Sequence, residues 1–517
     1  TFEVPEEWKD LEYKDNQKLT FNESINLLKG DTLPVSSFIK NKEGIFEGTT
    51  TKEEKRNIAE EVPCWISENC IECNQCAFSC PHGVIRPFLL DKKDSKVESI
   101  PSLLPKDKEF TIGINYEECT GCGVCTLACP GKLGKKALEM VPNKDKENNF
   151  EYLLKNNVND KYQSNLLTVK NVSFKEPKFE YSGACAGCGE TPYITNLTRV
   201  FNDNLMIANA TGCSSIYSGS VPSMPYSIPW ASSLFEDNTE YGYGILQGIN
   251  IKRDKIKKYM KEYPRNKLFK KWIENMDNYD ICKEVKENID YKKHPYLNDM
   301  KDYILPKQLW VLGGDGFAYD IGYGGLDHVL SKKDNINILV LDTEVYSNTG
   351  GQSSKSSNIG SVASFTSNGK DNYKKDLARI AMCYPHVYVA SVNIGYNKEQ
   401  YLKAIKEASL HNGPSLIIAY SPCIEHGIKT GMQHSQSNGY LATKCGYFLT
   451  FRYNPDTKKF SLDSKEPEFD KYEDYLMTEN RFASLVRKDK ERARLLLEEQ
   501  KQWAIDRYNY YKKISEE

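Results

Sequence analysis

Several features are missing from this sequence of 517 residues, and each absence excludes a class of protein. Neither sign of charge is in excess, because 69 Lys and Arg stand against 71 Asp and Glu, so bulk attraction to nucleic acid or to an anionic membrane is not expected. No apolar run approaches the ~18 residues of a membrane span, and no secretory signal opens the chain. The chain begins at Thr1 rather than Met, which suggests a fragment or a processed piece.

Cysteine is the informative residue. Sixteen cysteines in 517 residues are too few for a disulfide scaffold of this size. Most of them are clustered, which favours metal ligation in a reducing compartment. We therefore expect a cytoplasmic protein of anaerobic metabolism, although an organelle address could lie in an N-terminal part that this chain lacks.

Two runs of cysteine share the pattern C-x2-C-x2-C-x3-C-P. This is the bacterial ferredoxin run, in which three thiolates hold one [4Fe–4S] cluster and the fourth reaches the other cluster. Zinc is the alternative, but zinc sites use cysteine pairs that longer loops separate. The predicted ligands of cluster A are Cys70, Cys73, Cys76 and Cys129. Those of cluster B are Cys119, Cys122, Cys125 and Cys80.

A more dispersed set follows, in which Cys185 and Cys188 form another C-x2-C pair and Cys213 comes later. Alone, the pair fits a zinc half-site, a redox dithiol or a cluster equally well. Beside two ferredoxin clusters, a third [4Fe–4S] cluster is favoured, and it needs a fourth thiolate. Cys423 is the first candidate because it follows a predicted parallel strand. The others are Cys445, and then Cys64, Cys282 and Cys383, which read more simply as buried small residues.

Two successive predicted strands end in segments that suit a diphosphate and a divalent cation. Strand 309–312 leads into the glycine-rich residues 313–316, whose backbone N–H groups can approach a phosphate, and Asp315 offers an oxygen to Mg²⁺. Strand 337–341 leads into residues 342–352, which bring a hydroxyl, carbonyls and an amide to the same sheet edge. The nucleotide patterns G-x-G-x-x-G and G-x4-G-K-[ST] are absent. With clusters in line, thiamine diphosphate fits best, because clusters can remove electrons singly from its reaction with a 2-oxo acid.

The order of the motifs predicts four parts. They are a wrapping segment (1–60), a small α+β ferredoxin-like domain with two [4Fe–4S] clusters (61–142), a linker (143–181), and a thiamine diphosphate-binding domain with the proximal cluster and a C-terminal helical arm (182–517). Strands alternate with helices in the last part, which predicts an α/β fold with a parallel sheet covered on both faces. Residues 251–303 look like a helical insertion.

Seven segments resemble the single-chain pyruvate:ferredoxin (flavodoxin) oxidoreductases. They are residues 68–78, 182–193, 208–217, 230–238, 314–328, 342–352 and 421–427. The resemblance implies the C-terminal portion of such an enzyme, with its ferredoxin domain and its second thiamine-binding domain. It implies CoA-dependent oxidative decarboxylation of pyruvate to acetyl-CoA and CO2, with electrons relayed through three [4Fe–4S] clusters to ferredoxin or flavodoxin.

The resemblance also assigns roles to single residues. It gives the proximal cluster to Cys185, Cys188, Cys213 and Cys423, and Mg²⁺ to Asp315, Thr343 and the carbonyl of Val345. The residues that it places along the diphosphate are Gly314, Asp315, Gly316, Phe317, Thr343, Glu344, Val345, Tyr346, Ser347 and Asn348. Glu190 and Cys213 are expected close to the cofactor, and Glu190 and Asn348 are the expected catalytic residues.

The family's N-terminal thiamine domain and its main CoA-binding domain are not in these residues. The remaining N-terminal domains are therefore expected partners, together with pyruvate, CoA, ferredoxin or flavodoxin, and a second copy in a homodimer. One alternative is a fragment of a pyruvate:NADP+ oxidoreductase, with a fused flavoprotein module beyond residue 517. Another 2-oxo acid substrate is disfavoured by the close resemblance. A further alternative, an electron-transfer polyferredoxin module without its own catalysis, is disfavoured by the complete set of Asp315, Thr343 and Asn348.

Overall fold

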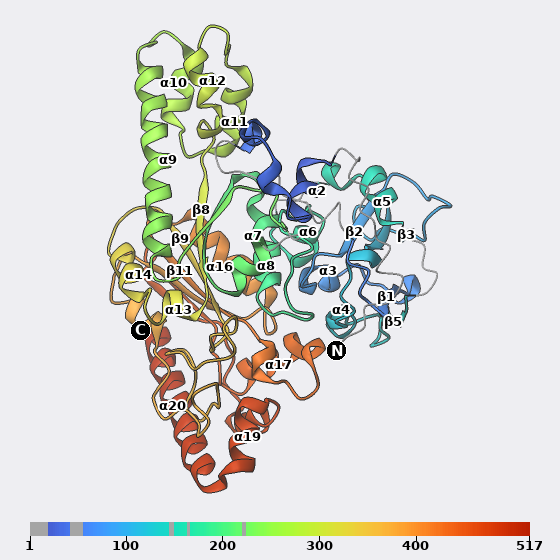
Figure 1. Ribbon diagram of the computed structural model, residues 1–517, viewed down its shortest axis with the longest axis vertical. Helices are drawn as coiled ribbons and strands as arrows, with labels where there is room; N and C mark the ends of the chain where they lie inside the picture. Colours follow the sequence, from blue (N-terminus) through green and yellow to red (C-terminus); the bar gives the residue numbers. More distant parts are fainter. Residues whose placement is uncertain (1–18, 42–54, 144–148, 163–165, 220–223) are drawn as a thin grey trace.

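The computed structural model describes residues 19–41, 55–143, 149–162, 166–219 and 224–517. Figure 1 shows a central sheet, with a helical protrusion at one end of the long axis, a helical arm at the other end and a smaller domain beside the sheet. The N-terminal wrapping segment lies largely outside the described residues, which include one short helix of it, α2 (Phe21–Asn26).

The central sheet has eight strands in the order β13-β12-β10-β11-β9-β8-β6-β7. In chain order they are β6 (Leu205–Ala210), β7 (Trp230–Ser233), β8 (Gln308–Gly313), β9 (Asn337–Asp342), β10 (Tyr388–Val392), β11 (Ser415–Tyr420), β12 (Phe451–Asn454) and β13 (Lys459–Leu462). Only the pairings made by β12 are antiparallel. Strands β9 and β11 are buried at every position, as expected for a parallel sheet with both faces covered.

Helices cover both faces of this sheet, and successive strand residues point to opposite cores. Val311 packs with one core and its neighbours Trp310 and Leu312 with the other. The Val311 core receives side chains of α9 (Asn238–Lys261), α13 (Asp315–Ala318), α14 (Tyr323–Leu330), α15 (Leu377–Ala381), α17 (Ser435–Lys444), α18 (Tyr472–Leu476), α19 (Asn480–Lys488) and α20 (Lys490–Glu516). The other core receives those of α7 (Thr191–Phe201), α8 (Cys213–Gly219) and α16 (Lys398–Leu410). The predicted fold class is confirmed.

The smaller domain is built from two antiparallel sheets and two short helices. Its elements are β1 (Glu61–Trp65) paired with β5 (Leu138–Pro142), the sheet of β2 (Ile85–Leu90), β4 (Glu109–Ile114) and β3 (Ile100–Pro101), and the helices α3 (Gln75–Ser79) and α4 (Val124–Ala128). The cysteine repeat is visible in the backbone, because Asn74 and Gly123 precede α3 and α4 at equivalent positions and are both left-handed. Asn and Gly are the residues that adopt this conformation at least cost.

Residues 143–181, which the sequence suggests as a linker, contain two helices that pack on both neighbours. Helix α5 (Phe150–Asn156) buries Phe150 and Leu153 against Phe88 of the cluster domain. Helix α6 (Val169–Ser173) buries Val169 and Val172 in a core of the large sheet. We call residues 149–181 the strap. Because most of its residues are polar, the sequence does not reveal the apolar side chains that pack the strap against both domains.

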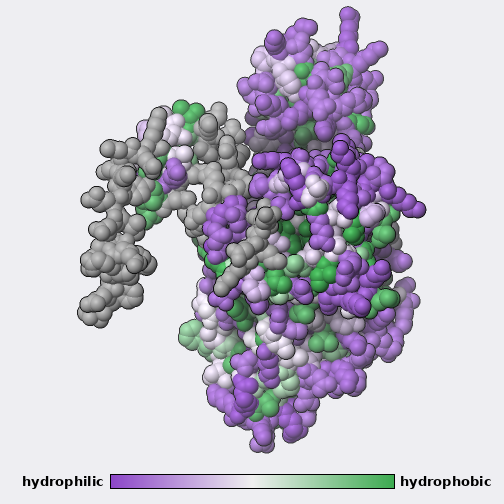
Figure 2. Space-filling model, turned by 90° about the vertical axis from the view of Figure 1, so that its right-hand side faces the viewer, coloured by the Kyte–Doolittle hydropathy of each residue, from purple (hydrophilic) through white to green (hydrophobic). Residues whose placement is uncertain are grey.

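The predicted helical insertion forms the protrusion. It consists of the outer part of α9 with α10 (Lys267–Glu274), α11 (Tyr279–Asn288) and α12 (Pro295–Asp299), and it has a core of its own around Ile256 and Trp272. Figure 2 shows that its surface is mainly hydrophilic. None of the helices that the structure describes is long and apolar enough to cross a membrane.

Candidate functional site

The structure brings together the four cysteines that the sequence assigns to cluster A. Cys70, Cys73, Cys76 and Cys129 line one cavity of about 20 Å³. Apolar residues complete its wall, among them Trp65 and Leu138. The first three thiols come from the run that leads into α3, and the fourth comes from the loop after α4, as the shared-ligand pattern of a two-cluster ferredoxin requires.

The four cysteines assigned to cluster B line a second cavity, of about 10 Å³. They are Cys80, Cys119, Cys122 and Cys125, with Val84 and Ile85 as apolar neighbours. Within the described parts of the chain, no three His, Cys, Asp or Glu side chains converge as ligands of a single metal ion. Two cavities, each lined by four thiols, are the arrangement that a pair of [4Fe–4S] clusters needs.

Burial makes free thiolates costly at both cavities. Burial first, and then the neighbouring thiols, raise the pKa of Cys76 and of Cys125 well above the ordinary value. The ionised sulfur that binds metal is thus disfavoured here without a compensating positive charge. Iron held between the thiols would supply that charge, so these residues fit the group that the sequence implies.

A third cavity, of about 150 Å³, contains the dispersed cysteine set. Cys185, Cys188, Cys213 and Cys423 all line it. Of the candidates for the fourth position, Cys423 lies here, where its thiol donates a hydrogen bond to Ser347 Oγ at 3.3 Å. Cys445 is buried in the core on the other face of the sheet, and Cys282 lies in the core of the protrusion.

The third cavity adjoins the cluster domain at cluster B. The backbone of Gly187, between Cys185 and Cys188, hydrogen-bonds the thiol of Cys122. Cys76 of cluster A lies in helix α3 and Cys80 of cluster B directly follows that helix, so the two cavities adjoin across α3. The three cysteine cavities therefore follow one another in the order third cavity, cluster B, cluster A.

A fourth cavity, of about 260 Å³, lies where β6, β8 and β9 end. Its lining includes Cys213, Gly314, Asp315, Gly316, Phe317, Thr343, Val345, Tyr346, Ser347 and Asn348, all expected from the sequence. It shares Glu190, Cys213, Thr343, Ser347 and Asn348 with the third cavity, so the two adjoin. A site at the carboxyl ends of parallel strands is the usual arrangement in such sheets. We call this space the cofactor cavity.

Asp315 is the strongest sign that the cofactor cavity holds a cation. Its carboxylate is buried, one oxygen accepts a hydrogen bond from Ser354, and Oδ1 has no partner. Burial, and next the Asp342 carboxylate, raise the pKa of Asp315 well above its ordinary value. A buried carboxylate oxygen that lacks a partner is costly unless a ligand completes it. The other two expected Mg²⁺ ligands lie together, because Thr343 Oγ1 donates a hydrogen bond to the Val345 carbonyl at 3.0 Å.

Gly316 shows how closely the cofactor cavity is walled. A Cβ atom at this position would lie 3.0 Å from the Phe235 ring and 3.3 Å from the Tyr346 ring. A side chain here would therefore displace one of the two rings, and glycine keeps the first turn of α13 open to a ligand.

Glu190 is buried between the third cysteine cavity and the cofactor cavity, and its side chain lines both. Burial raises its pKa to about 7, although a hydrogen bond with Tyr217 acts in the opposite direction. One carboxylate oxygen has no hydrogen-bond partner. Its side chain can therefore exist in either protonation state near neutral pH. Asn348 also lines both cavities, and it is an exposed residue.

Glu344 does not lie as expected. Its side chain is absent from the lining of the cofactor cavity and turns into the protein, where Lys374 lies 2.7 Å and Arg481 2.9 Å from its carboxylate oxygens. Burial alone would raise its pKa, but the charges of Lys374 and Arg481 outweigh burial and lower it to about 2. The backbone of Glu344 is left-handed (φ 60°), which turns the side chain away from its neighbours Thr343 and Val345.

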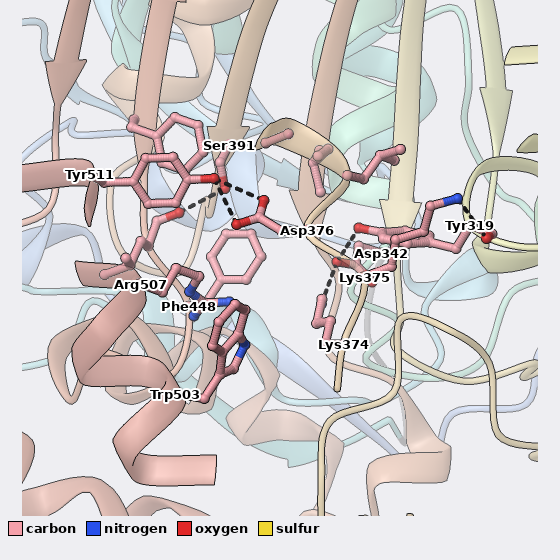
Figure 3. A pocket seen from close by; sticks show the side chains of 15 residues that line it. Tyr319, Asp342, Lys374, Lys375, Asp376, Ser391, Phe448, Trp503, Arg507 and Tyr511 are labelled. Atoms are coloured by element: carbon pink, nitrogen blue, oxygen red, sulfur yellow. Dashed lines mark hydrogen bonds and ion pairs between the residues drawn. The ribbon is translucent and has the colours of Figure 1, made fainter. Parts of the chain in front are cut away.

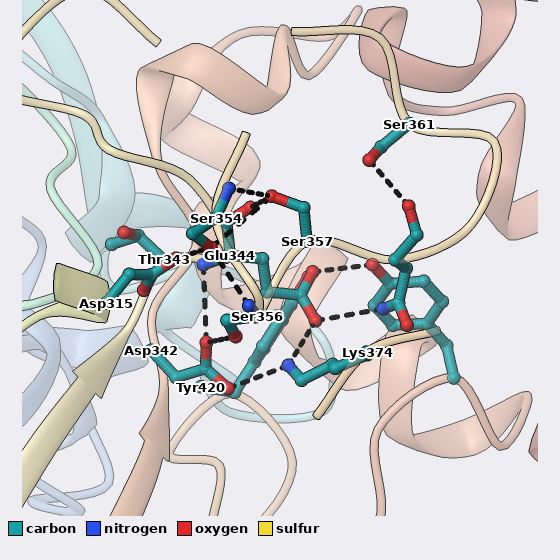
Figure 4. Close-up of polar contacts among 12 residues, drawn as sticks. Asp315, Asp342, Thr343, Glu344, Ser354, Ser356, Ser357, Ser361, Lys374 and Tyr420 are labelled. Carbon is teal, nitrogen blue, oxygen red and sulfur yellow. Dashed lines mark hydrogen bonds and ion pairs between the residues drawn. The ribbon is translucent and has the colours of Figure 1, made fainter. Parts of the chain in front are cut away.

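Lys374 is a residue of this region that sequence reasoning missed. Its ammonium group lies 2.8 Å from Asp342 Oδ2 and 2.7 Å from Glu344 Oε1, and all three side chains are buried (Figure 4). It also borders a small cavity of about 40 Å³, toward which Tyr511 and Asp376 point from the far side (Figure 3). No motif marks this lysine, because it comes from a loop more than twenty-five residues beyond the carboxylates that it joins.

Comparison with known proteins supports the two cofactor-binding parts of the chain. Residues 69–133 match the 4Fe-4S dicluster domain, and residues 302–419 match the thiamine pyrophosphate enzyme C-terminal TPP binding domain. Residues 21–59 match a domain of unknown function. These matches support iron–sulfur clusters and thiamine diphosphate as cofactors. Fold and site together define the class: a protein with an iron–sulfur dicluster domain and a thiamine diphosphate-binding domain.

Curated relatives narrow this class. Pyruvate:ferredoxin oxidoreductase from Moorella thermoacetica is 44% identical over 95% of this chain and 45% of its own length. Pyruvate-flavodoxin oxidoreductase from Enterobacter agglomerans is 40% identical over 99% of this chain and 47% of its own. Pyruvate dehydrogenase [NADP(+)] from Cryptosporidium parvum is 38% identical, over 95% and 29%. Over the part that it spans, the chain is similar to pyruvate:ferredoxin and pyruvate-flavodoxin oxidoreductases; it spans about half the length of the first two relatives.

Proposed function

We propose that this chain is the electron-relaying, thiamine-binding C-terminal portion of a pyruvate:ferredoxin oxidoreductase. The reaction is CoA-dependent oxidative decarboxylation of pyruvate to acetyl-CoA and CO2, with the electrons passed to ferredoxin or flavodoxin. One observation carries the proposal: the cofactor cavity shares five lining residues with the third cysteine cavity, and two further cysteine cavities follow it in a row.

The residues around the four cavities fit the proposed cofactors. Three sets of four cysteines would hold three [4Fe–4S] clusters, and Asp315, Thr343 and the Val345 carbonyl would hold Mg²⁺. Thiamine diphosphate, when bound, supplies the stabilisation of negative charge that lets a 2-oxo acid lose CO2.

The chain's own residues would prepare this chemistry. The unpartnered oxygen of Asp315 favours a divalent cation, and that cation neutralises the diphosphate. Glu190, with a pKa of about 7, can hold or release a proton between the cofactor cavity and the third cysteine cavity. Lys374 fixes Asp342 and Glu344 behind the loop, so that Thr343 and Val345 stay in place. Asn348, at the border of the two cavities, would contact the reacting part of the substrate.

Catalysis by the whole protein would need parts outside this chain. We propose that they are the N-terminal thiamine domain and the CoA-binding domain of the same enzyme, and that the enzyme is a homodimer. The alternative, a portion of a pyruvate:NADP+ oxidoreductase, has support from the relative of that name, but at lower identity than the ferredoxin- and flavodoxin-dependent relatives.

The native enzyme, purified without oxygen, tests this function. Three cubane clusters predict about 12 iron atoms per chain. With bound thiamine diphosphate, pyruvate should reduce methyl viologen, and CoA should stimulate that reduction. About 8 iron atoms without thiamine would leave a ferredoxin module and overturn the proposal. Viologen reduction that another 2-oxo acid drives, and pyruvate does not, would overturn the substrate assignment. Transfer of electrons to NADP+ by the purified protein alone would favour the alternative.

A further inference from the structure

The cavity of cluster A has two lining segments that also reach the surface. Ile71 lines the cavity and is 38% exposed. Gly131 and Ala137 line it from the two ends of a short loop, and residues 132–136 between them are all exposed. We call residues 132–136 the basic loop. Because the loop is exposed and both of its ends line the cavity, an outside molecule can approach cluster A directly through it.

The basic loop is held firmly against the cluster domain. The backbone N–H of Lys132 donates to the Asn69 carbonyl at 2.9 Å, and Asn69 Nδ2 donates to the Lys136 carbonyl at 3.1 Å. The side chain of Lys136 donates to the Leu127 carbonyl at 3.1 Å. The position of the loop relative to Cys70 and Cys129 is therefore fixed by hydrogen bonds, which makes it a preformed surface.

Charge and hydrophobicity are combined at the tip of the loop. Leu133 is 98% exposed and has a left-handed backbone (φ 51°), a costly conformation for leucine. Lys132 and Lys135 flank it and form no ion pair with any residue that the structure describes. Glu68 is the exposed acidic residue next to Asn69 in the chain. An exposed apolar side chain between free cations is a surface suited to an acidic protein with an apolar centre.

The duplicated fold shows what such a segment does elsewhere in the molecule. In the first repeat, the residues after Cys80 and Pro81 are buried, and the backbone N–H of Tyr181 donates to the His82 carbonyl. His82 also contacts the Ser182 carbonyl, at the start of the large domain. In the second repeat, the residues after Cys129 and Pro130 form the exposed basic loop. One copy of the segment thus binds the chain's own thiamine domain, and the other is free to bind a partner.

We propose that Leu133, flanked by Lys132 and Lys135, and Ile71, which is exposed at the same cavity, form the docking surface for an acidic electron-carrier protein whose redox group lies beside an apolar patch. The inference rests on the proposed function, since cluster A ends the row of clusters. In the complex, reduced cluster A loses one electron and the oxidised carrier gains it; no bond is made and no proton moves. Opposite charge speeds the encounter, and Leu133 anchors the docked complex.

The test uses the full-length enzyme and an oxidised bacterial two-cluster ferredoxin. We expect K132E/K135E to weaken ferredoxin binding, measured by calorimetry at low salt, at least tenfold, and to raise the KM for ferredoxin by a similar factor. L133S should weaken binding less, and its effect should persist at high salt. The rate of pyruvate-dependent methyl viologen reduction should not change, because this small cation needs no docking surface. The matched control is K255E/K258E, the same charge change at exposed positions on the protrusion.

Ferredoxin binding and KM at wild-type values in both K132E/K135E and L133S would overturn the proposal. Because calorimetry needs no pyruvate, it tests docking even if the enzyme fails to oxidise pyruvate, so the two failures are distinguishable. The neutral variant K132Q/K135Q provides a second check: an effect as large as that of charge reversal would contradict electrostatic attraction as the cause.

Discussion

Arg199 is buried at the junction of the two domains and belongs to neither predicted motif. On helix α7, it donates through Nη1 to the Ala77 carbonyl at 3.1 Å and to Asn196 Oδ1 at 3.0 Å. Burial, and next Arg86, lower its pKa to about 9, so it stays protonated at neutral pH, while the thiols of Cys80 and Cys76 act in the opposite direction. A fixed positive charge thus lies within electrostatic reach of one cysteine from each ferredoxin cluster.

This charge should tune the clusters, because a reduced cluster is more negative than an oxidised one. We expect R199M to lower the midpoint potential of a ferredoxin cluster. A shift of about 59 mV would make the ratio of reduced to oxidised cluster tenfold smaller at a given solution potential. Redox titration followed by electron paramagnetic resonance measures it. R199K keeps the charge and should stay closer to the wild-type potential. Wild-type potentials in an R199M protein with full iron content would refute this role.

Lys374 carries a second prediction at the residue scale. Its removal leaves Asp342 and Glu344 buried without their shared cation, and losing one partner of a buried ion pair typically costs about 3–5 kcal/mol. We expect K374M to unfold at lower denaturant concentration and to bind thiamine diphosphate more weakly, because the 343–348 loop loses its support. K355M is the control, since its pairing with Asp320 is at the surface. Equal effects of the two substitutions would contradict the argument.

Single residues also show why the site could be predicted only in part. The twelve cysteines predicted as ligands and the Asp315 turn occur in recognisable spacings, and the structure places all of them around cavities. Glu344 has the right place in its motif, but a left-handed backbone reverses its side chain. Lys374 and Arg199 belong to no pattern, since they meet their partners only through the packing of distant segments. The spacing of residues in the sequence therefore predicts ligands better than it predicts the buried charged groups, such as Lys374 and Arg199, that lie near those ligands.

The same difference holds at the scale of elements. Strands β8 to β11 follow from their continuous apolar runs, which are typical of a parallel sheet. The sequence did not indicate β6, β7, β12 or β13. Strands β7, β12 and β13 have only four residues each, and β7 has no fully buried residue, whereas β6 is as long and as buried as β8. The strap was missed for a similar reason, because scattered apolar side chains within a polar segment decide its packing.

The protrusion is an element group that should unfold on its own. Trp272 is fully buried in its separate core and donates through Nε1 to the Ile304 carbonyl at 2.8 Å. Substituting a buried Trp by Ala typically costs about 3–5 kcal/mol. We expect W272A to speed amide hydrogen exchange in α10 to α12 and to leave the iron and thiamine content unchanged. I251A, at an exposed site on α9, is the control. Loss of iron in W272A would show that the protrusion supports the clusters.

At the scale of the whole molecule, the proposed path of the electrons follows the row of cavities, and Cys423 is the ligand that the C-terminal half of the sheet contributes to it. We expect C423S to lower the iron content from about 12 to about 8 atoms and to abolish pyruvate-dependent viologen reduction, while thiamine binding persists. C445S, buried in the opposite core, should keep about 12. Iron counted by colorimetry decides between them. Loss of iron in C445S rather than in C423S would reverse the assignment.

The strap has a consequence for anyone who recombines these domains. Its side chains Phe150 and Leu153 pack with the cluster domain, and Val169 and Val172 pack with the sheet domain. A chimera joined at residue 143 would place a foreign cluster domain against Phe150 and Leu153, and also against Phe174 and Tyr181, which lie in the core of that domain. A junction at residue 181 would keep the strap with its native cluster domain and leave only Val169 and Val172 to be matched by a new sheet domain. The modular unit is thus larger than the cysteine motif suggests, and the transferable cassette ends near residue 181.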